Sequence, residues 1–436
     1  MLTKAATALS PIGWATLLSW AGLSSAAQAQ SLDILADFRI DRPSATDGFV
    51  TVRERPQPLY NPVPMRLGSV EVMPRVSAQA LYDSNIFVVS DAEDDAALHL
   101  TAAAEATQSA GNTSLAADAL IDRRQYLEND EQSTTDYWLG AAVRHALRRD
   151  SHVLGALRIG RETESLADPS VPLNTVRPSQ YDFVTGSLGA GRTFNRLLVA
   201  ARASVDDRSY KDGLDALGNP IEQNFRNRLL AIGEIAAEYD FGPRRSVFAQ
   251  ASFNRRDYRN QEGPEPIRDS SGYRVEAGAS FMLTPLIRSR VSAGYFRQDF
   301  KDPLFESVSG LAVRGRFDYL VTPLVTLTLT GSRGVEESST IGTGAYVADR
   351  VGVQADYELL RNLIVTATTS YERDRFEGLD RRYSIKRATV SAQYRLSPRL
   401  RLDAEYEGRD QDSVGTSPGR DFVRHQLTIG LTIQGI

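Results

Sequence analysis

Apolar and polar residues alternate along most of this chain, in long runs that are separated by almost no helical pattern. One such run is LVTLTLTG at residues 324–331, in which every second residue is apolar. Because successive side chains of a β-strand point to opposite faces, this run has one apolar face and one polar face. The same alternation recurs through the body of the chain, which predicts an all-β fold built from two-faced strands.

The connections between these runs are of two kinds that follow one another along the chain. The eight short connections lie at residues 109–112, 148–150, 194–196, 242–244, 284–286, 322–324, 360–362 and 397–399. The other connections are longer and polar, for example TESLADPSVPLNTVRPSQ and EGRDQDSVGTSPGRD. Short turns at one end and long loops at the other are typical of outer-membrane barrels, with the turns in the periplasm. Eight short turns, nine long loops and both chain ends in the periplasm predict 18 strands.

The apolar faces distinguish a membrane barrel from a soluble sandwich. They carry mostly alanine, valine and leucine, and the whole chain has only three tryptophans, which makes a wide soluble core difficult to pack. In lipid every backbone group must be paired internally, and a closed barrel achieves that. Aromatic residues beside the short turns are expected to form the interfacial girdle; they are Phe194, Tyr239, Phe241, Phe281, Tyr319, Tyr357 and Tyr394. We therefore predict a transmembrane, up-and-down antiparallel β-barrel with a polar lumen. A soluble multi-sheet fold is the alternative.

The N-terminus reads as a secretory signal. Lys4 precedes an apolar run and small residues that end in Ala27-Gln28-Ala29, which predicts cleavage after Ala29. Residues 30–67 lack periodicity and are rich in proline, so we expect a periplasmic extension, a segment tucked into the lumen, or a leader without function. The barrel is then expected over 68–436, in the outer membrane of a Gram-negative bacterium and surrounded by its lipids. Under this topology Gly218, Ser338 and Ser413 should be accessible from outside the cell, whereas Asn195 and Ser397 should not.

Composition and motifs argue against several functions. The chain has no cysteine and a net charge of −5, so a disulfide framework or thiolate site is impossible and nucleic acid is not an expected partner. The four histidines lie on separate strands or turns without ligand spacing, and no hydrolase, phosphate-loop or dinucleotide motif occurs. We expect neither a catalytic site, nor a metal, nor a cofactor.

The polar faces carry charge of both signs, which predicts a hydrated, charged lumen. Arginine forks can pair with carboxylates across strands, so these residues are either struts that fill the interior or the wall of a pathway. The predicted lumen-lining residues are Arg202, Asp206, Arg274, Glu276, Arg314, Arg316, Asp318, Asp356, Glu358, Arg387, Arg395, Arg401, Asp403 and Glu405. A barrel of 18 strands is wide enough for an aqueous channel.

A short motif near the first expected strand pair resembles a known family. Tyr82-Asp83-Ser84-Asn85, followed by the acidic residues 91–95, is similar to the first hairpin of the putative β-barrel porin 2 family. Members of that family often belong to exopolysaccharide or capsule secretion systems. The resemblance implies polysaccharide export across the outer membrane, together with a periplasmic polysaccharide export protein. Barrels of this kind usually end in an aromatic residue, whereas this chain ends in Gln434-Gly435-Ile436, so recognition by the barrel-assembly machinery is expected to be weaker.

Three functions stay open from the sequence. The first is a channel that exports an exopolysaccharide or capsular polysaccharide. The second is a general or small-solute diffusion porin, which a long inward-folding constriction loop would favour, although no single loop is long enough to demand one. The third is a structural or adhesive barrel, or an enzyme.

Overall fold

A computed structural model describes residues 49–435 of the chain, apart from residues 170, 243, 260–266, 339 and 341. The expected signal sequence, with its cleavage residues Ala27 and Ala29, lies outside the described residues. No helix among the described residues has the length and apolar character that a membrane-spanning helix requires.

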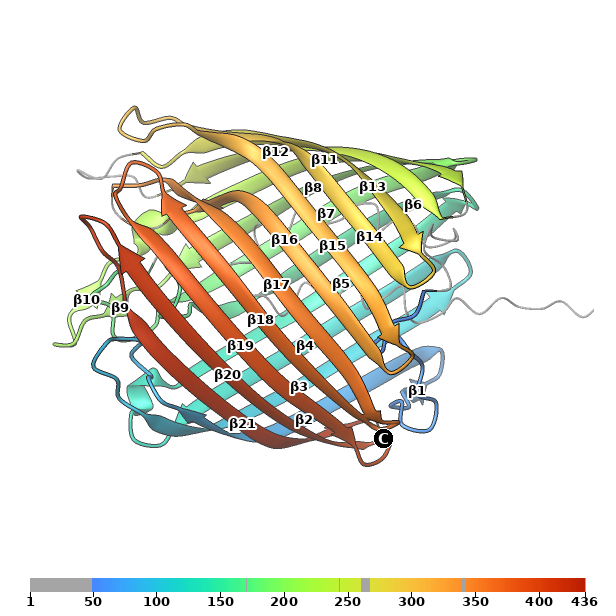
Figure 1. The fold of residues 1–436 in the computed structure, drawn as a ribbon, viewed down its shortest axis with the longest axis horizontal. Coiled ribbons are helices and arrows are strands. Elements are labelled where there is room, and N and C mark those ends of the chain that lie inside the picture. The colour runs from blue at the N-terminus through green and yellow to red at the C-terminus, as the bar shows by residue number, and fades with distance from the viewer. Residues whose placement is uncertain are drawn as a thin grey trace, which may run out of the picture.

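Eighteen long antiparallel strands form the described structure (Figure 1). They are β2 (Val70–Asp83), β3 (Asp95–Ala110), β4 (Thr113–Tyr126), β5 (Thr134–Arg148), β6 (Ser151–Thr163), β7 (Gln180–Phe194), β8 (Leu197–Tyr210), β11 (Arg228–Gly242), β12 (Arg245–Tyr258), β13 (Ser270–Thr284), β14 (Ile287–Phe300), β15 (Val308–Thr322), β16 (Val325–Glu337), β17 (Ala345–Leu360), β18 (Leu363–Phe376), β19 (Arg382–Arg395), β20 (Leu400–Val414) and β21 (Phe422–Gln434). Each pairs with its neighbour in sequence, and residues 75–83 of β2 pair with residues 426–434 of β21. The barrel is therefore closed, and the predicted fold and strand number are confirmed.

Short elements decorate the two ends of the barrel. The C-terminus and the short strand β1 (Met65–Leu67), which extends the sheet beside β2, lie at the end with the short turns (Figure 1). The two-residue strands β9 (Gly213–Leu214) and β10 (Pro220–Ile221) pair within the β8–β11 loop at the opposite end. The 3₁₀ turns η4 (Asp130–Gln132) and η5 (Asn224–Arg226) also lie in long loops.

Three short turns share a Ser/Thr-Pro pattern with a simple physical basis. Proline presets φ and needs no ladder donor. The hydroxyl just before it accepts the N–H of the residue just after it: Thr284 from Leu286, Thr322 from Leu324 and Ser397 from Arg399, each at 3.2 Å. The side chain thus satisfies a backbone donor that the tight turn leaves unpaired, which makes these sequences reliable turn signals.

The two faces of the strands separate as the alternation predicts. In β16, Leu329 is 44% exposed on the outer face, whereas Thr326 is fully buried and Thr328 nearly so on the inner face. The predicted girdle residues Phe194, Tyr239 and Tyr357 point outward beside the short turns. The outer face is therefore the surface that meets lipid.

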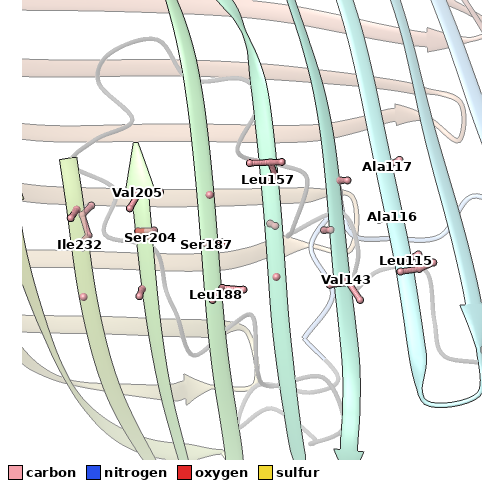
Figure 2. Close-up of a pocket in the computed structure, with 18 of the residues that line it drawn as sticks. Leu115, Ala116, Ala117, Val143, Leu157, Ser187, Leu188, Ser204, Val205 and Ile232 are labelled. Carbon is pink, nitrogen blue, oxygen red and sulfur yellow. The ribbon is translucent and has the colours of Figure 1, made fainter. Parts of the chain in front are cut away.

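Small residues hollow this outer face across β4 to β12. Gly155, Gly186 and Gly233 occupy outward positions there, flanked by Leu157 and Leu188, and the resulting apolar groove has a volume of about 1180 Å³ (Figure 2). Its apolar lining is what a lipid-facing surface requires.

Two of the positions expected to be accessible from outside are buried. Ser338 is 1% exposed and Ser413 is 8% exposed, so the expectation that they label from outside is wrong. Both lie near the end with the long loops, where Arg268 donates to the Ser338 carbonyl and the Gly419 amide of the β20–β21 loop donates to the Ser413 hydroxyl. Gly218 adopts a positive φ of 80° in the β8–β11 loop with no heavy atom near its Cβ position.

Candidate functional site

The structure places the predicted lumen residues at the inward positions of their strands and joins many of them in pairs. The nitrogen–oxygen distances are 2.6 Å for Arg202–Glu234, 2.9 Å for Arg316–Asp318, 2.8 Å for Arg401–Asp403 and 3.9 Å for Arg274–Glu276. Others pair with further residues: Asp206 with Arg208 and Arg228, Arg387 with Glu407, Asp356 with Arg53, Glu358 with Arg55, and Arg395 with Gln57. Arg314 and Glu405 occupy inward positions on β15 and β20.

Exposure divides these charges into two groups. The side chains of Arg202 and Glu234 are only 5% and 8% exposed, so this pair is an interior strut. The Arg316 side chain is 54% exposed, although it pairs with the buried Asp318, and its guanidinium faces the lumen. Buried struts and solvent-exposed charged side chains therefore coexist in the interior.

Charge is distributed unequally around the wall. Arg290 and Arg316 face each other across β14 and β15, and Arg314 is one inward position further along β15. Halfway around the ring, β4 and β5 carry the carboxylates Asp122 and Asp136 at inward positions. Arg124 and Arg144 also lie at inward positions of β4 and β5, so arginines cluster on β14 and β15 whereas both signs of charge occur on β4 and β5.

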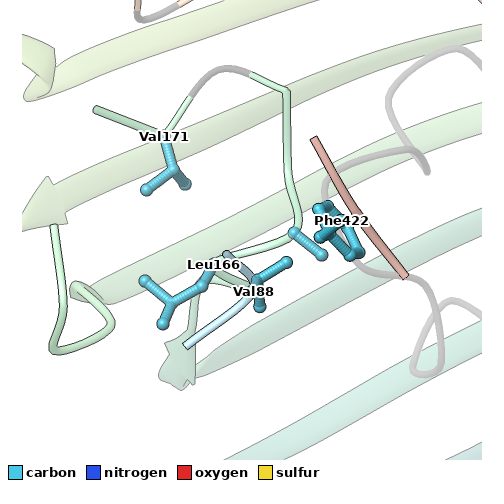
Figure 3. Close-up of a cluster of buried hydrophobic side chains, with 5 residues drawn as sticks. Val88, Leu166, Val171 and Phe422 are labelled. Carbon is cyan, nitrogen blue, oxygen red and sulfur yellow. The ribbon is translucent and has the colours of Figure 1, made fainter. Parts of the chain in front are cut away.

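The described part of the β6–β7 loop, residues 164–169 and 171–179, folds into the barrel at the end with the long loops; we call it the mouth loop. Its apolar residues Leu166, Ala167 and Val171 are buried against Val88 of the β2–β3 loop and Phe422 of β21 (Figure 3). The strands β6 and β21 are separated by four strands of the ring, so the loop crosses the mouth rather than extending into solvent. Burial of these apolar side chains favours the folded-in position.

Arginines from three directions hold the mouth loop. Arg226 in η5 forms a buried pair with Glu164, at 2.5 Å. Arg409 of β20 donates to the Ala167 carbonyl at 2.6 Å. Burial lowers the pKa of Arg226, but the charge of Glu164 outweighs this effect, so the pKa of Arg226 is raised and its guanidinium keeps its charge.

Arg420 forms the most connected of these contacts. Its guanidinium donates to the carbonyl oxygens of Pro172, Leu173 and Thr175 in the mouth loop at 2.6–3.2 Å, and to that of Phe87 at 3.0 Å. Burial lowers the pKa of Arg420, yet arginine keeps its proton in proteins. One side chain therefore ties the β2–β3, β6–β7 and β20–β21 loops together.

The hairpin end of β16 and β17 also bends into the lumen. Val335, Ala345 and Val347 continue the outward side of these strands, yet they pack against Phe296 and Val308 from the inner face of β14 and β15. Arg268 fastens the bend by donating to the carbonyls of Ser338 and Thr340, at 2.8 and 3.1 Å. The hairpin end therefore lies inside the barrel wall, so two segments occupy the lumen at the end with the long loops.

The family-like motif Tyr82–Asn85 lies at the seam where the ring closes. Asp83 is fully buried; it accepts hydrogen bonds from Arg424 and Gln426 of β21 and from the Tyr126 hydroxyl. Asn85 binds the carbonyls of Val89 and Val423, at 2.7 and 3.1 Å. Tyr82, by contrast, is 45% exposed on the outer face, and Ser84 bonds the backbone of His425. The motif thus joins the first strand to the last.

Within the described part of the chain, no three potential metal ligands gather in a group. The mouth loop, Arg420 and the inward hairpin were missed in the sequence because a polar, proline-containing loop reads as solvated. The available signal was the presence of Leu166 and Val171 in that loop, since apolar side chains in a hydrated loop need a partner.

A closed 18-stranded barrel with an apolar outside, a charged inside and an inward-folded mouth loop defines an outer-membrane, porin-like channel. The family model for "Putative beta-barrel porin 2" matches residues 57–435, and the chain belongs to this family. The family points to a channel rather than an enzyme, and to the outer membrane.

Three solved structures are similar to this chain at low sequence identity. The outer membrane protein OpdK from Pseudomonas aeruginosa is 13% identical, with a TM-score of 0.44, over 83% of this chain and 99% of that one. OccK2 (OpdF) from the same organism, in complex with glucuronate, is 12% identical, with a TM-score of 0.47, over 84% and 98%. A mutant of the ferric enterobactin receptor PfeA from Pseudomonas aeruginosa is 8% identical, with a TM-score of 0.46, over 85% of this chain and 82% of that one. A search of curated proteins finds no match.

Proposed function

We propose that this barrel is a diffusion channel for small, charged, hydrophilic solutes. The observation that carries the proposal is the mouth loop, which is folded across the end with the long loops and held by Arg420, Arg226 and Arg409. A segment that crosses the opening obstructs the passage of a wide polymer, whereas it gives a channel for small solutes the constriction that excludes larger ones. The inward β16–β17 hairpin adds a second narrowing segment.

The charges of the wall support the class of solute. The exposed Arg316 guanidinium lines the lumen, and Asp122 and Asp136 lie at inward positions in another part of the wall. A solute with both charge and polar groups can exchange its hydration for these partners, whereas an apolar solute gains nothing from them. Selectivity by charge is therefore expected in addition to selectivity by size.

Export of a polysaccharide, with a periplasmic export protein as partner, is the second candidate. One observation favours it: the inner face of β18 to β20 is rich in hydroxyls and carboxylates, including Thr366, Thr368, Ser391, Glu405 and Glu407. Sugar hydroxyls pair well with such groups. A polymer would nevertheless require the mouth loop to leave its position.

Solute uptake by proteoliposomes tests the proposal. The purified protein should admit small charged solutes and monosaccharides, and an Arg420→Ala variant should admit larger sugars by freeing the mouth loop. Arg381→Ala is the matched control, because Arg381 also donates to loop carbonyls, those of Ser417 and Pro418, but does not touch the mouth loop. Absence of small-solute uptake, together with loss of surface polysaccharide in a deletion strain, would refute the proposal in favour of export.

A further inference from the structure

Residues 49–57 lie inside the rim at the short-turn end; we call them the rim segment. Phe49, Val52 and Gln57 are 5%, 1% and 6% exposed. Phe49 stacks under Arg288 of β14, the Val52 amide donates to the Thr326 hydroxyl at 3.0 Å, and Gln57 accepts from Arg395 of β19 at 3.1 Å. The segment therefore follows the inner rim from β19 to β14, which takes it along roughly a third of the ring.

A single helical turn shapes the rim segment. The Thr51 amide donates to the Glu54 carboxylate at 3.0 Å, and the Glu54 amide donates back to the Thr51 hydroxyl at 3.3 Å. The Arg55 amide completes the turn by donating to the Thr51 carbonyl at 3.1 Å. This reciprocal pattern is a capping box, in which two backbone donors of the turn are satisfied by side chains of the turn itself.

The turn presents its cations to carboxylates of the wall. Arg55 pairs with Glu358 at 2.5 Å and also donates to the Pro323 carbonyl, while Arg53 lies 4.0 Å from Asp356. Asp356 and Glu358 are successive inward residues of β17, both nearly buried. Glu54 pairs with Arg288 at 3.1 Å on the other side. The complementary charges show that this position is specific.

The hydrogen bonds that attach the rim segment differ from the backbone ladder that holds the barrel wall together. Among the described residues, every hydrogen bond between the rim segment and the barrel uses a side chain on at least one side, whereas the chain first joins the sheet ladder at β1. Breaking these contacts leaves all 18 strands paired. The rim segment can therefore leave the rim without unfolding the barrel.

We propose that the rim segment is a latch, which narrows the periplasmic mouth when docked on β14–β19 and widens it when released. The inference rests on the proposed channel function and adds a gate to it. Several ion pairs that hold the rim segment have an exposed partner; the Arg53 side chain, for example, is 54% exposed. Salt screens such pairs, so a higher salt concentration weakens the docking of the rim segment. The released state exposes Asp356 and Glu358 at the mouth, so release also makes that mouth more attractive to cations.

The absence of cysteine permits a reversible lock. The pair Val52→Cys and Thr326→Cys places two thiols where the native backbone and hydroxyl are in contact, so oxidation should fix the latch. Ser109→Cys with Ser114→Cys is the matched control, because these residues pair across β3 and β4 at the short-turn end, away from β14–β19, and their bridge leaves the rim segment free.

Single-channel recording on the purified, full-length mature protein gives the test, with bridge formation verified by mass spectrometry. The oxidised latch pair should show only a low-conductance level, and reduction should restore transitions to a higher level, whereas the control pair should show both levels in either state. Arg55→Glu should shift the ratio of the levels about fivefold toward the higher one, as expected for loss of one partly buried ion pair. Arg55→Glu with Glu358→Arg should restore the original ratio.

Equal conductance of the oxidised and reduced latch pair would overturn the latch and leave the channel intact. A protein that conducts no ions would instead contradict the proposed function, and a second measurement, of chemical labelling, would then test the latch. A single Val52→Cys variant should react slowly with a water-soluble maleimide, and Arg55→Glu should accelerate the reaction about fivefold. An unchanged rate would overturn the latch without reference to conductance.

Discussion

The separation of lipid face from lumen face makes a quantitative prediction at Leu188 in β7. This side chain is 72% exposed on the outer face. It lies midway along its strand between the interfacial Phe194 and the outward Asp182 near the loop end. Leu188→Arg therefore places a cation near the membrane midplane, which costs about 2 to 4 kcal/mol.

The neighbouring residue supplies the control. Ser187 is one position along the same strand and faces the lumen, where an arginine remains hydrated. Val184→Arg is the depth control, since this outward residue lies close to the interface and should cost only about 0 to 1 kcal/mol. The free energy of unfolding is measured by urea titration of the protein folded in phospholipid vesicles.

For Leu188→Arg we expect the folding equilibrium constant to decrease about 30- to 700-fold, which corresponds to a cost of about 2 to 4 kcal/mol. Ser187→Arg should change it far less. Equal losses for the two variants would show that the faces are assigned in the wrong register. A loss at Val184→Arg as large as that at Leu188→Arg would show that the membrane lies elsewhere along the strands.

Three further predictions concern the seam, the wall and the loops. Asp83→Asn should destabilise the barrel by about 3 to 5 kcal/mol, because it leaves the largely buried Arg424 without its ionic partner. Asp257→Asn, which removes an exposed ion pair with Arg255, should cost at most about 1 kcal/mol. The heat-dependent mobility of the folded barrel on gels measures both effects. Arg316→Gln should lower the ratio of anion to cation permeability in reversal-potential measurements, and an unchanged ratio would exclude this guanidinium from the path. Cysteine at Gly218 should label on intact cells whereas cysteine at Ser338 should not, and equal labelling would show that the β16–β17 hairpin does not fold inward.

The sequence predicted the barrel well because its signals are local. Alternation assigns each side chain of a strand to one face, and Ser/Thr-Pro pairs mark turns through one hydroxyl and one fixed φ. The number of strands then follows from counting turns. Residues such as Thr326 and Leu329 needed no tertiary information to be placed on their faces.

The inward-folded segments could not be predicted in the same way. The position of the mouth loop depends on Arg420, which lies about 250 residues further along the chain, and on Phe422 beside it. Val335 and Val347 keep the alternation of an outward face, but the bend of their hairpin turns that face onto β14 and β15. Likewise, the sequence left open whether residues 30–67 enter the lumen, and the docking of residues 49–57 depends on charges at the ends of distant strands. Loop length and local pattern carry no information about such contacts.

Polymer exclusion tests most directly the central claim that the lumen passes small solutes and is narrowed by the mouth loop. Single-channel conductance of the wild-type protein is recorded in polyethylene glycols of increasing size, beside Arg420→Ala and Arg381→Ala. Small glycols should enter and lower the conductance, larger ones should be excluded, and only Arg420→Ala should shift the cut-off to larger glycols. Entry of large glycols into the wild-type channel, with the same cut-off in all three proteins, would contradict the claim.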